Sequence, residues 1–106
     1  MRPRSLLTRA HPFLAVLAGL VACACGNTVY AIQANSASNA LAEARELGAE
    51  KLAPFEYYYA KEHMEKAQEE AAEADYSDAI NIAEEAEEYA NKAIRLSREA
   101  QRGAGR

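Results

Sequence analysis

The sequence predicts an all-α protein, in which a cleaved signal peptide and a short tether precede two or three helices that form an antiparallel hairpin or bundle. Three observations predict this class. Alanine recurs at steps of three and four residues along most of the second half of the chain. Proline and aspartate stand where helices would begin. No segment alternates β-branched and polar residues as a half-buried strand does.

The N-terminus has the pattern of an export signal. Arg2, Arg4 and Arg9 precede any acidic residue, and an apolar run of thirteen residues follows at 13–25, broken only by Gly19. A membrane-spanning helix needs about 20 residues, so this run is too short for a stable span. It suits the apolar region of a signal peptide, and the small residues at its end suit cleavage.

The end of that run, Leu20-Val21-Ala22-Cys23, resembles the lipobox of bacterial lipoprotein signals. The resemblance implies that residues 1–22 are removed by cleavage after Ala22 and that the Cys23 sulfur carries diacylglycerol. Cys25 is the competing acylation site, but no bulky aliphatic residue stands at the equivalent place before it. The alternatives are an ordinary secretory signal with two incidental cysteines and an uncleaved N-terminal anchor.

An acylated Cys23 makes the membrane the first expected partner. Palmitate-like chains attach a protein stably when two or three are present, at about 0.8 kcal/mol per buried methylene. In a Gram-negative host the residue after the cysteine matters, and here it is Ala24 rather than aspartate. Resemblance to lipoprotein sorting then implies the inner leaflet of the outer membrane, with the chain facing the periplasm.

Residues 23–35 are expected to form the lipidated cysteine and a tether, and residues 36–100 an alanine-rich helical domain. Asn35 or Ser36 can cap the first helix, although the spacing of Val29 and Ile32 also allows a start near Thr28. The inward positions of this helix are expected to be Ala37, Ala40, Leu41, Ala44 and Leu47.

A second helix is expected to begin at Pro54, which suits a first turn because it has no amide hydrogen to leave unpaired. Its inward positions are Tyr57, Ala60, Met64, Ala67, Ala71 and Ala74. Asp75 or Ser77 would cap a third helix, which folds back on the second. Its inward positions are Tyr76, Ala79, Ile80, Ala83, Ala86, Ala90, Ala93 and Ser97, and residues 101–106 are expected to be a disordered tail.

The alanines favour helix and close approach of helices, but they bury little apolar area. The tyrosines must therefore supply much of the packing. Consecutive residues of a helix are about 100° apart, so Tyr57, Tyr58 and Tyr59 cannot all face one core. We expect at least one to be exposed, and we take these three and Tyr89 as possible partner contacts. The alternative is that an exposed tyrosine only covers the end of the hairpin, with its hydroxyl in water.

No catalytic, cofactor-binding or metal-binding constellation can be assembled from the residues. A helical metal site at His63 would need a second ligand three or four residues away, where Ala60, Lys66 and Ala67 stand; His63 is expected to be solvated. The run Glu84-Glu85-Ala86-Glu87-Glu88 is expected to be a solvated face. Loss of residues 1–22 would change the net charge from −4 to −7, which argues against nucleic acid as a partner. We expect neither an enzyme nor a small-molecule substrate.

An alanine-rich helix, the Ala53-Pro54 step and a hairpin turn with Asp75-Tyr76 resemble an uncharacterised family of small Gram-negative envelope lipoproteins over most of residues 36–100. Some relatives carry an added OmpA-like domain that binds peptidoglycan, which is absent from these residues. The segment from Asp75 to Ile80 also resembles the start of a second tetratricopeptide helix. The short trimeric lipoprotein that is linked covalently to the wall ends in lysine, whereas this sequence ends in Arg106.

The function expected from these features is a lipid-anchored periplasmic helical protein that acts as a non-catalytic interaction module for another envelope protein. The alternative is a structural spacer of the envelope that self-associates through the alanine stripe.

Overall fold

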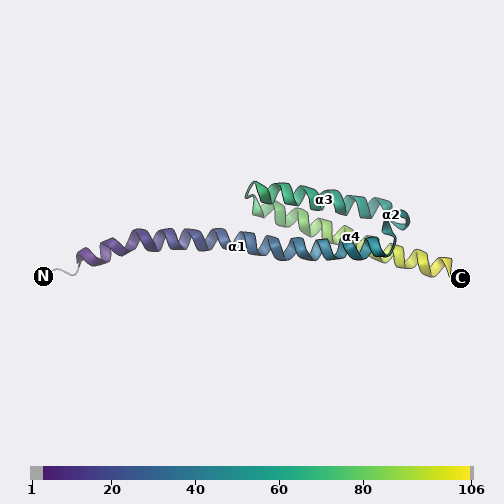
Figure 1. The fold of residues 1–106 in the computed structure, drawn as a ribbon, viewed down its shortest axis with the longest axis horizontal. Coiled ribbons are helices and arrows are strands. Elements are labelled where there is room, and N and C mark those ends of the chain that lie inside the picture. Colours follow the sequence, from purple (N-terminus) through teal and green to yellow (C-terminus); the bar gives the residue numbers. More distant parts are fainter. Residues whose placement is uncertain (1–3, 106) are drawn as a thin grey trace.

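The computed structural model describes residues 4–105, including the side chains of residues 12–19 and 25–105. These residues are all-α, as predicted, and form α1 (Arg4–Glu46), α2 (Ala49–Leu52), α3 (Pro54–Ala72) and α4 (Tyr76–Ala104). Figure 1 shows α3 and α4 as an antiparallel hairpin, with α1 running beside them in the direction of α4. The molecule measures 89 × 22 × 15 Å.

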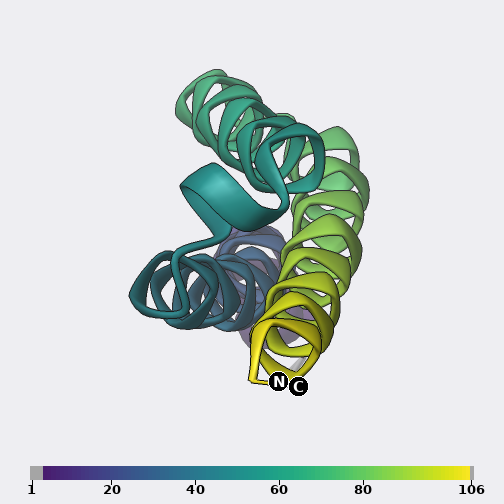
Figure 2. The same cartoon turned by 90° about the vertical axis from the view of Figure 1, so that its right-hand side faces the viewer.

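Helix α4 is the central element. It packs along both α1 and α3, which contact each other less extensively. In the view along the bundle in Figure 2, α2 lies on the open side between α1 and α3. Each long helix therefore depends on α4 for most of its packing.

Small side chains fill the interior. Most of the inward positions predicted for the three helices are confirmed as buried, and one exception is Ala74, which lies exposed in the α3–α4 turn. Because alanine has only a methyl group, the helix backbones can approach closely, but each residue contributes little buried area. The largest buried side chains are those of Tyr57, Met64 and Ile94; the fully buried alanines are Ala37, Ala44, Ala49, Ala60, Ala67, Ala79, Ala83, Ala86, Ala90 and Ala93.

The connection from α1 to α3 uses a glycine and a proline. Gly48 has a φ of 79°, a left-handed conformation that glycine adopts without the strain of a side chain. The short helix α2 follows, and Ala53 then turns the chain so that Pro54 occupies the first turn of α3. The predicted start of the second helix at Pro54 is confirmed, and Glu56 lies in its first turn.

The α3–α4 turn is a Schellman motif with alanine where glycine is usual. The Asp75 amide donates to the Glu70 carbonyl at 2.9 Å, and the Ala74 amide donates to the Ala71 carbonyl at 3.0 Å. Ala74 has a φ of 62°, which L-residues other than glycine rarely adopt. Asp75 then caps α4 by accepting from the Asp78 amide at 3.3 Å, so Asp75 rather than Ser77 is the cap.

The predicted tether at 23–35 and the predicted helix start at Ser36 are wrong, because α1 continues through these residues. Tertiary contacts support the extra turns: the Tyr30 ring packs on Tyr76 at 6.4 Å, and the Gln33 amide donates to Glu87 at 2.5 Å. Instead of capping a helix, the Ser36 hydroxyl donates to Glu87 at 2.6 Å.

The predicted disordered tail at 101–106 is also wrong for the described part, since α4 continues to Ala104. The Gln101 side-chain amide donates to the Leu47 carbonyl at 2.8 Å, which fixes the last turns of α4 to the end of α1. A glycine within a helix costs only about 1 kcal/mol relative to alanine, so Gly103 does not prevent this extension. Arg106 lies outside the described residues.

Candidate functional site

Aromatic rings line the outer seam between α3 and α4. The Tyr59 ring lies 4.0 Å from the Tyr89 ring and 3.9 Å from the His63 ring, which stacks on it. Phe55 packs against both tyrosines, with ring centroids 5.8 Å from Tyr59 and 6.3 Å from Tyr89. We call Phe55, Tyr59, His63 and Tyr89 the aromatic seam. Ring pairs at these distances are attractive beyond the area that they bury.

Polar groups on both helices fix the aromatic seam. The Tyr59 hydroxyl donates to Glu85 Oε1 at 2.6 Å, and this hydrogen bond is the main cause that raises the pKa of Tyr59 to about 12. His63 Nδ1 donates to the Tyr59 carbonyl at 2.9 Å, while its Nε2 lies 3.6 Å from Glu85 Oε2. Lys92 Nζ lies 5.2 Å from the centroid of the Tyr89 ring. The prediction that His63 is simply solvated is therefore wrong: it is half-buried in this network.

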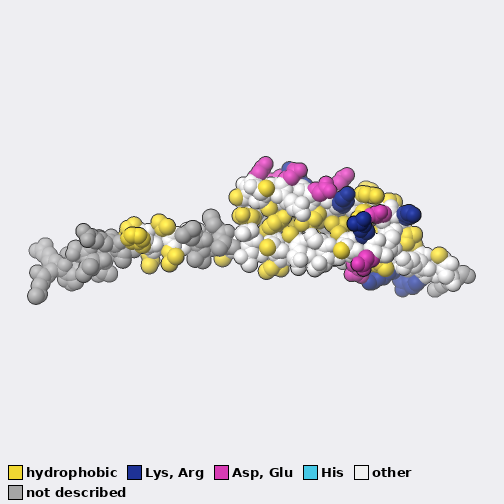
Figure 3. Space-filling view, in the orientation of Figure 1, with side chains coloured by type: hydrophobic (Ala, Val, Ile, Leu, Met, Phe, Trp, Pro, Cys, Tyr) yellow, Lys and Arg dark blue, Asp and Glu magenta, His cyan; other side chains and the backbone are white. Residues whose placement is uncertain are grey.

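Apolar side chains remain exposed beside this network. Phe55 is 65% exposed, Tyr58 47% and Leu52 43%. We call these three residues the docking patch; they lie in α2 and in the first turns of α3. Figure 3 shows hydrophobic side chains on the surface at this end of α3. Sequence reasoning missed Leu52 and Phe55, because their exposure depends on the turn at Ala53, which has no periodic signal.

The four tyrosines singled out in the sequence have different environments. Tyr57 is only 7% exposed and belongs to the core, whereas Tyr58 packs on its ring at 5.1 Å and faces solvent. Tyr59 and Tyr89 are half-buried in the aromatic seam. The prediction that at least one of the three consecutive tyrosines is exposed is confirmed by Tyr58. Tyr57 is buried, so the prediction that it is a partner contact is wrong.

The residues of the predicted acylation site are only partly described. The side chains of Ala22 and Cys23 lie outside the described residues, and the backbone of α1 passes through both. The Cys25 thiol is free and exposed. Within the residues that the structure describes, no helix is both long enough and apolar enough to cross a membrane. Acylation of Cys23 stays a prediction.

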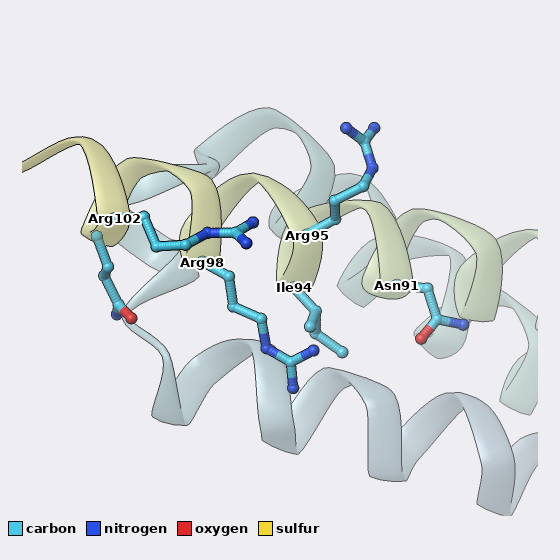
Figure 4. Close-up of a pocket in the computed structure, with 6 residues that line it drawn as sticks. Asn91, Ile94, Arg95, Arg98 and Arg102 are labelled. Carbon is cyan, nitrogen blue, oxygen red and sulfur yellow. The ribbon is translucent and has the colours of Figure 1, made fainter.

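A groove runs along the C-terminal half of α4. It has a volume of about 650 Å³ and is lined by Asn91, Ile94, Arg95, Arg98, Gln101 and Arg102; we call it the arginine groove. In Figure 4, Ile94 and Arg98 point towards α1, whereas Arg95 points away from it. Arg98 pairs with Glu43 of α1, and Arg95 pairs with Glu99 at 3.2 Å. The spacing of these arginines is visible in the sequence. Which of them face solvent and which face α1 depends on how the helices pack.

Metal-binding geometry is not found in the described part of the chain, where no three histidine, cysteine or acidic side chains could hold one ion. Near His63 a smaller hollow of about 290 Å³ is lined by Glu62, His63, Lys66 and Ile82. Lys66 Nζ forms ion pairs there with Glu70 Oε1 at 2.7 Å and with Glu69 Oε2 at 3.4 Å. The geometry therefore offers surfaces for contact, namely an aromatic one on α2–α3 and a basic one on α4.

Comparison with known proteins places the chain in a family without giving it an activity. No curated protein and no solved structure matches it. A family model matches residues 33–104, which begin on α1 and include α2, α3 and α4. The chain therefore belongs to the family described as domain of unknown function DUF4398.

Proposed function

We propose that this protein is a lipid-anchored, non-catalytic interaction module of the bacterial envelope, which binds another envelope protein through the docking patch. The observation that carries the proposal is the exposure of Phe55. Its ring is 65% exposed although it touches Tyr59 and Tyr89. An aromatic ring held in place by neighbours loses little freedom on binding, and such residues dominate binding energy at interfaces.

The rest of the docking patch supports the same use. Leu52 and Tyr58 lie within three residues of Phe55 in the chain, and exposed apolar side chains that gather in one region of a small protein mark contact sites more often than scattered ones do. Charged groups lie along the aromatic seam that holds Phe55: Lys92 lies over the Tyr89 ring, and Glu85 accepts from the Tyr59 hydroxyl. An apolar centre with a polar rim is the usual anatomy of a protein interface.

The lipid anchor would set the distance between the membrane and the docking patch. From Cys23 to Glu46 the helix α1 would rise about 35 Å, at about 1.5 Å per residue. The turn at Gly48 and the docking patch lie at the far end of α1, whereas the α3–α4 turn lies near Tyr30. A chain acylated at Cys23 would thus present the patch away from the membrane, towards the periplasm if the host is Gram-negative.

A second candidate function is self-association as an envelope spacer. The sequence suggested the alanine stripe as the contact surface. The alanines of that stripe are buried inside a single chain, so they are not free to pair with another copy. Self-association therefore needs a different surface.

Photo-crosslinking in living cells tests the docking proposal. A photoreactive residue replaces Leu52 in one strain and Tyr58 in another, and the control strain carries it at Glu65 on the exposed outer face of α3. We expect a discrete adduct with a second envelope protein from the two patch positions and not from Glu65. Adducts of equal yield from all three positions, or adducts containing only this chain, would contradict the proposal.

The anchor has a separate test. The intact mass of the chain extracted from membranes is expected to correspond to a polypeptide that begins at Cys23 and carries acyl chains. Cys23→Ser should abolish the added mass, whereas Cys25→Ser should leave it unchanged. A chain that begins elsewhere without acyl mass would overturn the anchor and leave the docking surface to be judged by the crosslinks alone.

A further inference from the structure

The outward side of α1 is left uncovered by the other described helices. α4 and α3 pack on the side of α1 that carries the buried residues Ala37, Ala40 and Ala44. On the opposite side, exposed residues recur at alternating steps of three and four, which keeps them on one face of the helix. We call them the outer α1 face: Cys25, Thr28, Ile32, Asn35, Asn39 and Ala42.

The outer α1 face belongs to a stretch of the chain without charge. No acidic or basic residue occurs between His11 and Glu43, although 26% of the whole chain is charged. Ile32 is 68% exposed, and Val29 on the flank of the face is 52% exposed. The solvent side of a surface helix normally carries charged and polar residues, whereas depletion of charge is typical of the centre of an interface. The outer α1 face therefore has the composition of a contact surface.

Lipid would not cover most of this face if Cys23 is acylated and α1 stands upright on the membrane. Ile32 follows Cys23 by nine residues, which places it about 13 Å further along the helix axis. The headgroup layer of one leaflet is only about 5–8 Å thick. Ile32, Asn35 and Asn39 would therefore lie above the lipid, where a protein surface is the occupant that could cover them.

We infer that the outer α1 face binds the same face of a second copy of this chain, with the two α1 helices parallel. The inference rests on the proposed anchor, because acylation of Cys23 in both copies fixes their N-termini in one membrane and excludes an antiparallel pair. In a parallel two-fold pair each residue lies opposite its own copy, so a charged residue on the face would meet a like charge. The stretch without charge meets this requirement, which contact with an unrelated protein would not impose.

The spacing of the outer α1 face fits a short parallel coiled coil. Its steps of three and four correspond to the a and d positions of a heptad, with Cys25, Ile32 and Asn39 at a. An asparagine at an a position lowers the stability of a coiled coil but specifies its register and the number of its strands. The next position of the same spacing is Glu46, where two copies would repel each other, so the contact ends at Ala42.

The pair should be weak away from the membrane. Ile32 is the one large apolar side chain at the centre of the face, so little apolar area is buried on contact. Anchoring in one membrane raises the effective concentration of the two copies and holds them side by side. We therefore expect dimers in the membrane and monomers after dilution in detergent. The docking patch lies on α2 and the start of α3, so it remains free in each copy.

Oxidative crosslinking in isolated membranes tests the inference with the full chain. Acylation would consume the Cys23 thiol, so Cys25 would be the remaining thiol. With a copper–phenanthroline oxidant we expect a disulfide-linked dimer through Cys25 and, in a Cys25→Ser background, through Ile32→Cys, since a disulfide needs Cα atoms within about 7 Å. The matched control in the same background is Asn27→Cys, which is exposed on another side of α1 and should give no dimer. Equal yields from Ile32→Cys and Asn27→Cys, or no dimer through Cys25, would overturn the inference.

Charge at position 32 gives a second test, in which the Cys25 disulfide is the readout. Ile32→Lys and Ile32→Glu each place like charges opposite each other, and each alone should abolish the dimer. Two differently tagged copies, one with each substitution, should regain it as a heterodimer. Asn27→Lys is the control and should leave the dimer unchanged; Ile32 is exposed, so its variants should fold, and circular dichroism checks this. A dimer that persists in Ile32→Lys, or a mixed pair that does not form, would contradict the parallel contact.

The anchor is judged separately in the same membranes. The intact mass of the monomer shows whether Cys23 carries acyl chains. An acylated chain that gives no Cys25 dimer would overturn the contact between copies and leave the anchor in place, whereas a chain without acyl mass would overturn the anchor itself.

Discussion

The two flanks of α4 are built differently. Towards α3, the aromatic seam borders the buried alanines: the Tyr59 and Tyr89 rings lie 4.0 Å apart and tilted, and Phe55 packs on both. Towards α1, the contact consists of alanines, of the partly buried Leu41 and Leu47, and of hydrogen bonds between distant parts of the chain, such as those from Gln33 and Ser36 to Glu87. The α3 flank thus leaves the Phe55 ring largely in solvent beside the contact, whereas the contact with α1 is closed by small side chains and hydrogen bonds.

This difference separates stability from binding. The alanines and Glu87 lie inside the bundle and contribute to the fold alone. Phe55 and Tyr58 remain largely in solvent, so their apolar area contributes little to folding and is free to contribute to association. Substitutions in the interior should therefore change stability, and substitutions in the docking patch should change binding.

Overpacking the interior should have the largest effect on both flanks. Ala90 is completely buried within the main core cluster. Ala90→Leu adds three carbon atoms where the helices are in close contact, and we expect it to lower the free energy of unfolding by about 1–3 kcal/mol. Urea denaturation followed by circular dichroism measures the change. Ala42→Leu, at an exposed position of α1, is the control and should have little effect; similar losses for both variants would contradict the close packing.

Substitution of Glu87 should destabilise the contact with α1 and leave the contact with α3 largely unchanged. Its carboxylate accepts from the Gln33 amide at 2.5 Å and from the Ser36 hydroxyl at 2.6 Å. Glu87→Ala leaves both donors without this acceptor, and we expect a loss of about 1–2 kcal/mol that is felt mainly in α1. Hydrogen exchange measures this: the substitution should accelerate amide exchange in α1 more than in α3. Glu84→Ala, with no ion-pair partner among the described residues, should be neutral; equal acceleration in α1 and α3 would disprove the division between flanks.

A glycine at position 74, in the α3–α4 turn, should stabilise the protein. Ala74 has a φ of 62° and therefore carries strain that glycine would not. Ala74→Gly should raise the free energy of unfolding by about 0.5–1 kcal/mol, even though glycine usually weakens helical proteins. The control Ala42→Gly, within α1, should lower it by about 1 kcal/mol. A loss of stability in both variants would show that the turn at Ala74 is not left-handed in solution.

The smallest expected effect is a loss of stability at alkaline pH from the aromatic seam. The pKa of Tyr59 is raised to about 12 from its ordinary value of 10, mainly because its hydroxyl donates to Glu85. A pKa raised by folding gives stability that is complete below pH 10 and is lost as the pH rises towards about 12. The stability difference between wild type and Tyr59→Phe, measured by urea denaturation, should shrink over this range. A constant difference would contradict the hydrogen bond.

Much of the fold could be predicted from local signals. The alanine spacing identified most of the buried positions, and Pro54 and Asp75 marked the starts of α3 and α4, because each of these signals acts within one or two turns. The extension of α1 before Ser36 and of α4 to Ala104 could not be predicted. They rest on contacts such as Gln33 with Glu87 and Gln101 with Leu47, which join residues 54 positions apart.

The candidate site was less predictable than the fold. The sequence indicated that one tyrosine of residues 57–59 would be exposed, and Tyr58 is. The helical spacing also placed Tyr57 among the inward positions, and Tyr57 is buried. The sequence nevertheless kept Tyr57 among the possible partner contacts, because the phase of α3 around its axis is set by packing against α4. The stacking of His63 on Tyr59 was also missed, although their spacing of four residues places them on one helix face.

The most direct test of the docking claim compares binding and stability in the same variants. Phe55→Ala/Tyr58→Ala is introduced into the strain that carries the photoreactive residue at Leu52, and the crosslink and the thermal midpoint of the purified variant are both measured. We predict that the crosslink to the second envelope protein is lost while the midpoint stays close to that of the parent. A crosslink that persists, or one that is lost only together with the fold, would contradict the assignment of the docking patch.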